Sequence, residues 1–500
     1  MAKYTRGEFL GFGAALAGAF SLGKVPTLGR PVSAEQPPSA AGPGVEADLI
    51  VVNARVFTSD GARPRAEAFA VKNGRFIAVG STGEVRNVAT ARTRVVDAQQ
   101  MFVTPGFIDC HCHPSGVQEL YGVNTNVKTV REVQAAIRRK AESTPPGLWI
   151  NGFQFDDTKL DRPLTKKDLD EATTEHPVVV AHRGGHTSWY NSKALELAGI
   201  TNDTPDPPDG RFFRENGELT GRVAENARGV FNRVGKRETF TPEQRRDRAR
   251  DGMRHMSQLF SACGLTSVHN AGTNSEHILA YEDCRKNGEL THRAYMMIRS
   301  TEAFNGFKAA NIYTGFGDEW IRVGGIKFVA DGSASERTMR MSTPYVGTND
   351  YGILTMTQEQ VYEAVDDAHS HNFQVGIRWM FAHKSFLDAG IRVPGASDYN
   401  PGPFEPLMAI QSMVTRKDYK GRVWGANQKV SVDEALTIAT INGAYPSFEE
   451  NLKGSIAAGK LADFVMLEKD PHEVDPDQIM NIKVNRTVIG GRIVYPNERT

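Results

Sequence analysis

Both ends of the chain show the alternation of apolar and polar residues that predicts β-strands. Residues 47–81 alternate in this way between turns at "SDG", "KNG" and "GST", and residues 459–470 and 485–495 repeat the pattern. Strands at two ends that enclose a long middle segment predict one small β-sandwich, assembled from residues 47–104 and 450–500. Two unrelated β-segments are the alternative.

Between these ends, short apolar segments alternate with helical patterns. The predicted helices are residues 127–143, 241–264 and 357–372, and the predicted strands are residues 102–111, 148–155, 176–183, 265–272, 292–299, 322–332, 373–379 and 391–398. This alternation is typical of a parallel sheet, and at this length it predicts an α/β fold with a (β/α)8-type barrel over residues 105–449. In such barrels the chemistry lies where the strands end.

The first 34 residues have the pattern of an export signal. Lys3 and Arg6 precede an apolar stretch at residues 10–22, and "VSA" at 32–34 offers small residues at a cleavage point. The stretch is short for a bilayer span, which needs about 20 residues, and an uncleaved anchor or a buried helix is the alternative. The segment resembles a twin-arginine signal with a single arginine, because Gly7 stands where the second is expected. We expect an exported, periplasmic or extracellular protein with a linker at residues 35–46.

The charge balance and the cysteine content exclude several classes of partner. Lys+Arg and Asp+Glu both total 59, so the formal net charge is zero. Without a charged run, neither a nucleic acid nor a stable membrane partner is expected. Four cysteines in 500 residues make no disulfide framework. A small-molecule substrate remains the expected partner, and a homo-oligomer stays open.

Two histidines stand one residue apart at the end of the strand predicted at 102–111. Successive side chains of a strand point to opposite faces, so His111 and His113 share one face while Cys110 and Cys112 share the other. Two imidazoles at a strand end are half of a metal site. Two packed or surface histidines are the alternative.

A lysine and an aspartate at later strand ends are candidates for the other half. Lys327 lies in an otherwise apolar strand, where an unpaired ammonium is costly. It is therefore either paired with Asp331 or Glu336, or carries a carboxylate that binds metal. Asp398 closes the predicted strand 391–398 and could take a proton from water whose pKa a metal lowers, although "SDYNPG" is also good turn chemistry.

Several segments together resemble the amidohydrolase superfamily, and specifically its amidohydrolase-3 (YtcJ-like) branch. The segments are residues 103–113 ("VTPGFIDCHCH"), 149–157, 162–200, 264–272, 324–338 ("GGIKFVADGSASERT"), 393–407, 431–445 and 454–471. The resemblance as a whole extends over nearly all of the mature chain. The resemblance implies a metal-dependent-hydrolase barrel with a β-sandwich, which hydrolyses non-peptide C–N bonds such as those of amides or of N-acyl and N-formyl compounds.

The resemblance also implies a role for individual residues. The metal-centre residues are His111, His113, a carboxylated Lys327 and Asp398, and Asp398 is also the catalytic residue. The substrate-pocket residues are His186, Trp189 and Asn191, for which a packed loop is the alternative. The implied cofactor is a divalent metal, with zinc as the default for histidine-rich sites. The family holds one or two ions.

The chain departs from the family pattern between the lysine and the aspartate. The family supplies two further histidines there, but Arg378 takes the place of the first, and only 20 positions separate it from Asp398. A barrel of about 250 residues allots about 31 to each strand–helix unit. About two units are therefore missing, as an internal deletion between residues 378 and 398 would produce.

The missing histidines make present activity the open question. We expect one metal ion or none, unless His182, His186, His269 or His383 substitutes as a ligand. The alternative to a working hydrolase is a catalytically impaired or inactive remnant of the family, which is either a binding protein or a deletion product.

Overall fold

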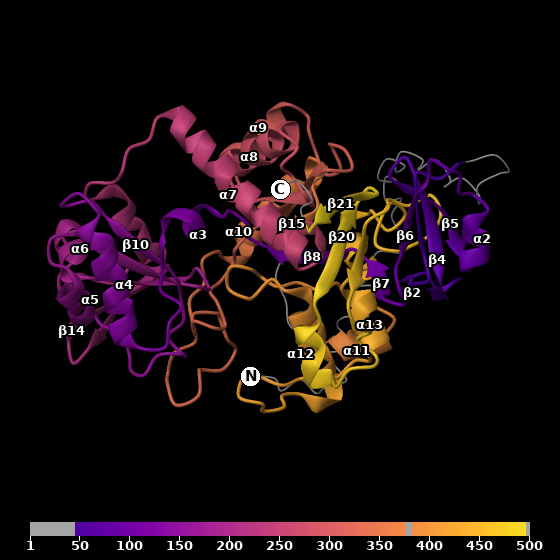
Figure 1. Cartoon of the computed structure of the whole chain (residues 1–500). Coiled ribbons are helices and arrows are strands. Elements are labelled where there is room, and N and C mark those ends of the chain that lie inside the picture. Colours follow the sequence, from indigo (N-terminus) through magenta and orange to yellow (C-terminus); the bar gives the residue numbers. More distant parts are fainter. Residues whose placement is uncertain (1–45, 377–382, 497–500) are drawn as a thin grey trace, which may run out of the picture. The chain divides into compact units, whose positions relative to one another are not determined.

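A computed structural model describes residues 46–376 and 383–496 (Figure 1). The predicted export signal at 1–34, nearly all of the predicted linker at 35–46, and Arg378 lie outside the described residues. Within the described part of the chain, every helix is too short or too polar to cross a bilayer.

The two ends of the chain form a β-sandwich. Its four-stranded sheet has the order β5-β4-β1-β6, with β1 (Leu49–Val52), β4 (Ala68–Lys72), β5 (Arg75–Gly80) and β6 (Arg94–Asp97). Its six-stranded sheet has the order β21-β20-β19-β7-β2-β3, with β2 (Arg55–Phe57), β3 (Arg65–Ala66), β7 (Phe102–Pro105), β19 (Phe464–Leu467), β20 (Val484–Ile489) and β21 (Arg492–Tyr495). A short helix, α2 (Thr82–Arg86), follows β5.

The sandwich joins residues that lie far apart in the sequence. Strand β19 pairs antiparallel with β7, and the yellow and indigo strands of Figure 1 meet there. Phe69 of one sheet and Phe464 of the other are fully buried, with ring centroids 4.8 Å apart. The predicted sandwich built from both termini is confirmed.

A parallel sheet of five strands carries the middle of the chain. Its order is β18-β17-β16-β15-β8, with β8 (Phe107–Cys112), β15 (Leu265–Thr273), β16 (Arg293–Ile298), β17 (Ile321–Lys327) and β18 (Val375–Gly376). The helices that alternate with these strands are α7 (Pro242–Ala262), α8 (Ser275–Lys286), α9 (Thr301–Ala309) and α10 (Gln358–Ser370). This curled sheet of alternating strands and helices is of the (β/α)-barrel type that the sequence predicts. In the described residues its edges are β8 and β18, and the number of missing units stays a prediction.

The three helices predicted from the sequence begin where threonine can cap them. Thr129, Thr241 and Thr357 are the N-caps of α4 (Val130–Glu142), α7 and α10. Each threonine side chain accepts a hydrogen bond from the N3 backbone, and N3 is Glu or Gln. This pattern satisfies backbone N–H groups that a helix start leaves without partners.

Residues 148–155 and 176–183 are strands, but their predicted place in the barrel is wrong. They form β10 (Ile150–Phe155) and β11 (Val178–His182) of a separate sheet with the order β13-β14-β12-β11-β10-β9. The other strands are β9 (Val123–Asn124), β12 (Thr187–Tyr190), β13 (Gly210–Glu215) and β14 (Glu218–Glu225). Because β12 pairs antiparallel with both β11 and β14, this sheet is mixed. Around it lie α3 (Val117–Tyr121), α5 (Lys166–Ala172), α6 (Ser192–Leu197) and η1 (Asn226–Arg233).

The predicted strand at 391–398 has no regular strand structure. Pro394 carries no N–H to donate to a neighbouring strand. The segment nevertheless runs beside β8, since N of Cys110 donates to O of Gly395 at 3.0 Å and N of Asp398 donates to O of His111 at 2.7 Å.

The remaining elements are short helices: α11 (His383–Asp388), α12 (Pro406–Thr415), η2 (Ala426–Gln428), α13 (Val432–Ile438), α14 (Ile441–Ala444), η3 (Tyr445–Ser447) and η4 (Pro476–Asn481).

A buried ion pair joins the parallel sheet to the sandwich. Arg293 opens β16 and Asp463 immediately precedes β19, and their side chains are 1% and 4% exposed. Nε of Arg293 donates to Oδ2 of Asp463 at 2.7 Å, and Nη2 donates to Oδ1 at 2.9 Å.

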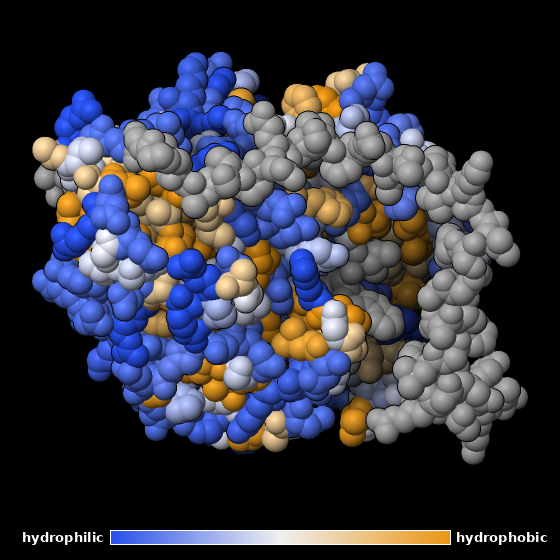
Figure 2. Space-filling model, turned by 90° about the vertical axis from the view of Figure 1, so that its right-hand side faces the viewer, coloured by the Kyte–Doolittle hydropathy of each residue, from blue (hydrophilic) through white to orange (hydrophobic). Residues whose placement is uncertain are grey.

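The outer face of the molecule in Figure 2 is largely hydrophilic, and its hydrophobic residues lie in separate groups.

Candidate metal centre

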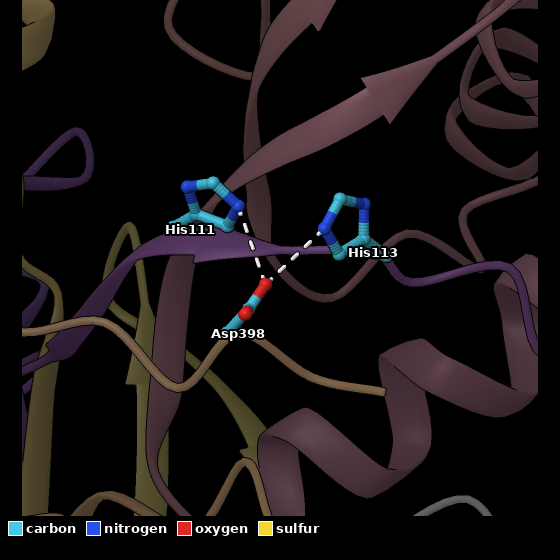
Figure 3. A group of neighbouring side chains, drawn as sticks. All are labelled: His111, His113 and Asp398. Atoms are coloured by element: carbon cyan, nitrogen blue, oxygen red, sulfur yellow. Dashed lines mark ion pairs between the residues drawn. The ribbon is translucent and has the colours of Figure 1, made fainter. Parts of the chain in front are cut away.

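Two imidazoles and one carboxylate meet at the end of β8. His111 lies on β8 and His113 directly follows it, and the alternation of the strand turns both rings to the same side. Oδ1 of Asp398 lies 3.3 Å from Nε2 of His111 and 3.3 Å from Nε2 of His113, as Figure 3 shows. One ligand atom from each of the three residues lies within 4.8 Å of the other two.

Lys327 reaches the same place from the end of β17. Its Nζ lies 2.9 Å from Nε2 of His111 and 3.5 Å from Nε2 of His113. The ends of parallel strands face the same edge of a sheet, which is why β8 and β17 can both contribute. The structure thus brings together all four side chains that the sequence proposed for a metal centre.

The donor atoms fit a divalent metal ion. A tetrahedral ion with ligand bonds of about 2.0–2.2 Å separates neighbouring ligand atoms by about 3.3–3.6 Å. The two distances of 3.3 Å between Asp398 and the imidazoles match this separation. Imidazole nitrogen and carboxylate oxygen are also the donor types that zinc takes in catalytic sites.

Burial keeps His113 in the form that binds metals. Removal from solvent lowers its pKa to about 4, and the Lys327 charge also lowers it, while Asp398 acts in the opposite direction. The imidazole is therefore neutral at pH 7. A neutral imidazole has the lone pair that a metal ligand needs.

Asp109, which the sequence reasoning missed, binds the segment that carries Asp398. It is buried on β8, and burial raises its pKa to about 6. Its Oδ1 accepts from N of Ser397 at 3.0 Å and from N of His111 at 3.1 Å, and its Oδ2 accepts from Oγ of Ser397. The alternation that pairs His111 with His113 also puts residue 109 on their face, and this signal could have found it.

A second group of acids and a histidine lies at the end of β11, in the loop after β10 and in the loop after β17. His182 contacts Asp157 through Nε2 at 3.3 Å and Glu336 through Nδ1 at 3.4 Å. Arginines already neutralise the neighbouring acids, since Arg183 pairs with Asp156 at 2.9 Å and Arg337 with Asp157 at 2.7 Å. The group is an ion-pair network that ties the loop after β17 to the mixed sheet.

Glu336 and Asp331 are the two acids that the sequence analysis gives as alternative partners of Lys327, and each has other hydrogen bonds. Glu336 is buried, and its Oε2 accepts from Oγ1 of Thr187 at 2.6 Å. Oδ2 of Asp331 accepts from N of Arg340 at 3.0 Å.

The three residues expected in the substrate pocket lie at the junction of β12 with its neighbours. The His186 side chain is 15% exposed, and its Nδ1 lies 2.8 Å from Oε2 of the buried Glu225. Trp189 is 4% exposed and packs against Phe155, with ring centroids 4.8 Å apart.

Asn191 has the contacts of a packed loop. It is fully buried, its Oδ1 accepts from N of Val178 at 2.9 Å and from N of Ala194 at 3.0 Å, and its Nδ2 donates to O of His176 at 2.9 Å. Its amide thereby caps α6 and joins it to β11. A substrate role for His186 and Trp189 stays a prediction.

The four histidines considered as substitute ligands are not part of the described group of ligand atoms around Asp398. In the described part of the chain, the group with Asp398 contains His111 and His113 and no other histidine. His182 and His186 contact their own acids, and burial lowers the pKa of His269 to about 3. Burial also lowers the pKa of His383.

The fold and the residues at its strand ends define a class of protein. A curled parallel β/α sheet with a β-sandwich, and with two imidazoles, a carboxylate and a lysine at one edge, is the architecture of metal-dependent hydrolases. The family model described as "Amidohydrolase family" matches residues 94–378 and 376–495. The chain belongs to this amidohydrolase family, whose members are hydrolases that act on C–N bonds.

Individual relatives agree with this assignment along most of their length. The N-substituted formamide deformylase of Arthrobacter pascens is 26% identical, over 91% of this chain and 99% of that enzyme. YtcJ of Bacillus subtilis (strain 168) is 24% identical, over 86% of this chain and 96% of that protein. The crystal structure of an uncharacterized metal-dependent hydrolase from Pyrococcus horikoshii OT3 covers 86% of this chain and 99% of its own, with a TM-score of 0.64 and 20% identity, and so supports the fold.

The family match is interrupted at one point. The two segments matched by the family model meet at residues 376–378. The alignment with the deformylase runs over 544 positions, more than the 500 residues of this chain, so that enzyme has positions without a counterpart here.

Proposed function

We propose that this chain binds a divalent metal ion, zinc by default, and hydrolyses a non-peptide C–N bond of an amide, N-acyl or N-formyl compound. The observation that carries the proposal is the approach of Oδ1 of Asp398 to both imidazoles, at 3.3 Å each. The similarity to an N-substituted formamide deformylase supports the N-formyl class.

In this proposal His111, His113 and Asp398 hold the ion, and Lys327 contributes as a carbamate. A carboxylated lysine would replace an ammonium, which lies 2.9 Å from an imidazole nitrogen, by an anion suited to a cation site. A divalent ion at this position supplies Lewis acidity, which lowers the pKa of water and polarises a carbonyl group.

The protein's own residues then handle the proton. Asp398 accepts a proton from the attacking water as the new C–O bond forms. It returns this proton to the nitrogen as the C–N bond breaks, so the carboxylate is regenerated in each cycle. Burial lowers the pKa of His113, so its neutral imidazole would serve as a metal ligand and not as the proton acceptor.

His186 is the residue we propose for substrate contact. Its ring is partly exposed, and the buried carboxylate of Glu225 fixes its orientation through Nδ1 at 2.8 Å. Trp189 and Asn191 are both buried, so we propose that they hold the segment that carries His186 in place and do not contact substrate directly.

The second candidate is a catalytically impaired or inactive remnant. It is favoured by the interruption of the family match at residues 376–378, where the family's further histidines are expected. A site with two imidazoles and one acid would hold an ion with fewer nitrogen ligands than the family provides, which weakens binding.

The deciding experiment measures metal content per chain and hydrolysis together. The purified chain is loaded with Zn²⁺, desalted, and assayed on a set of N-formyl and N-acyl amines, with His111→Ala as the site variant and the exposed His371→Ala as the control. One bound ion with hydrolysis supports the hydrolase. One ion without hydrolysis selects the remnant, and no retained ion overturns metal-dependent hydrolysis.

A further inference from the structure

The candidate metal centre depends on a backbone segment that has little regular structure of its own. Asp398 has a φ of +52°, in the left-handed region that residues other than glycine adopt at a cost. Such a conformation persists when the surrounding contacts determine it. In the described residues, the segment that carries Asp398 flanks β8 without being a regular strand.

One buried carboxylate makes both side-chain contacts that hold Ser397, the residue before Asp398. Asp109 accepts from both the backbone N and the Oγ of Ser397, the residue next to Asp398. The same Ser397 Oγ accepts from N of Tyr399 at 2.9 Å. The Asp109 carboxylate and the Ser397 hydroxyl therefore fix the backbone on both sides of residue 398.

The other end of the turn is held independently. Glu119 on α3 accepts from the hydroxyl of Tyr399 at 2.5 Å and from Nδ2 of Asn400 at 2.8 Å through one oxygen, Oε1. Loss of the contacts of Asp109 would therefore free the Ser397 side chain and loosen the backbone before residue 398, while the bond from N of Asp398 to O of His111 and the contacts of Glu119 remain.

We propose that Asp109 is a positioning residue, which holds the carboxylate of Asp398 at the two imidazoles by binding Ser397. The inference rests on the proposed function only in that Asp398 is taken as a metal ligand. Because Asp109 lies two residues before His111 on the same strand face, one strand sets both the imidazoles and the anchor for the acid. The contact between Asp109 and Ser397 adds to the two backbone hydrogen bonds that hold the irregular segment 395–398 beside β8.

The test uses Ser397→Ala, which removes the hydroxyl, and Ser397→Thr, which keeps it. Asp109→Asn is the stronger variant. Two quantities are measured on the full chain: hydrogen exchange of the peptide that spans residues 395–400, and affinity for Co²⁺ with its visible absorption spectrum. We expect faster exchange and about 10–100-fold weaker Co²⁺ binding in Ser397→Ala and Asp109→Asn. Ser397→Thr keeps the hydroxyl, so its hydrogen exchange and its Co²⁺ affinity should equal those of the unaltered chain.

Asp398→Asn separates positioning from ligation. It should weaken Co²⁺ binding while leaving the exchange of residues 395–400 unchanged. Unchanged exchange and Co²⁺ affinity in Ser397→Ala would overturn the positioning role, and this variant decides the matter if Asp109→Asn fails to fold. If the unaltered chain binds no Co²⁺, the proposed function fails, whereas the exchange measurement still tests whether Asp109 holds the segment.

Discussion

Oδ1 of Asp398 lies 3.3 Å from Nε2 of His113. The two residues stand at opposite ends of the segment that forms the parallel sheet, and the fold makes them neighbours at the end of β8. An acid within reach of two imidazoles is the arrangement on which the proposed metal binding and the proposed proton transfer both depend.

Asp398→Asn should abolish most hydrolysis. The amide can neither accept the proton of the attacking water nor carry a negative charge to a cation, and a general acid–base group typically contributes about 10²–10⁴-fold in rate. The measurement is kcat on the best N-formyl or N-acyl substrate. Asp366→Asn, on the exposed face of α10, is the control. Equal rates for Asp398→Asn and the unaltered chain would exclude Asp398 as the proton shuttle.

Asn191→Ala should lower stability more than it changes substrate binding. The side chain satisfies buried backbone groups at Val178, Ala194 and His176, and leaving such groups without partners costs about 1–3 kcal/mol. Chemical denaturation measures the change, with the exposed neighbour Ser192→Ala as the control, for which we expect less than about 1 kcal/mol. Unaltered stability together with a raised KM would instead assign Asn191 to the substrate pocket.

Asp463→Ala should destabilise the fold strongly, because it leaves the Arg293 charge buried without its partner. Breaking one member of a buried pair costs about 3–5 kcal/mol. The matched control is Asp251→Ala. Oδ1 of Asp251 lies 2.7 Å from Nη2 of Arg254, and both side chains are partly exposed. For this variant we expect the free energy of unfolding to fall by about 0–1 kcal/mol. Similar free energies of unfolding for the two variants would show that the buried pair does not join the sheets energetically.

Stability should fall as the pH drops below about 6.5, in part because of His292. Burial lowers its pKa to about 3 in the folded chain, against an ordinary value of 6.5. Between these values the unfolded chain binds a proton that the folded chain does not, so the contribution is fully present above pH 6.5 and is lost progressively toward pH 3. His292→Gln should reduce the slope of unfolding free energy by about 1.4 kcal/mol per pH unit between pH 6 and 4.

The control for this pH dependence is the exposed His371→Gln, which should keep the slope of the unaltered chain. Denaturant titrations at several pH values give the slopes. If His292→Gln and the unaltered chain have the same slope, His292 is not buried in its neutral form.

Much of the candidate site was predictable because strand geometry is local. The two-residue spacing of His111 and His113 fixes their common face whatever surrounds them. Lys327 and Asp398 were recognisable at the ends of their segments, the first by its apolar neighbours. Asp109 was missed although the same alternation applies to it. Its partner Ser397 lies 288 positions later in the chain, so the contact can be recognised only in the folded structure.

The sequence alone determined the elements: the capped helices after Thr129, Thr241 and Thr357, the alternating strands at both ends, and the shared face of His111 and His113. Only the tertiary structure decided that β10 and β11 belong to a separate mixed sheet, and that residues 391–398 lie along β8 without forming a strand. The physical reason is that caps and alternation act over a few residues, whereas strand pairing uses backbone groups that are the same in every residue, so the sequence of one strand does not specify its neighbour.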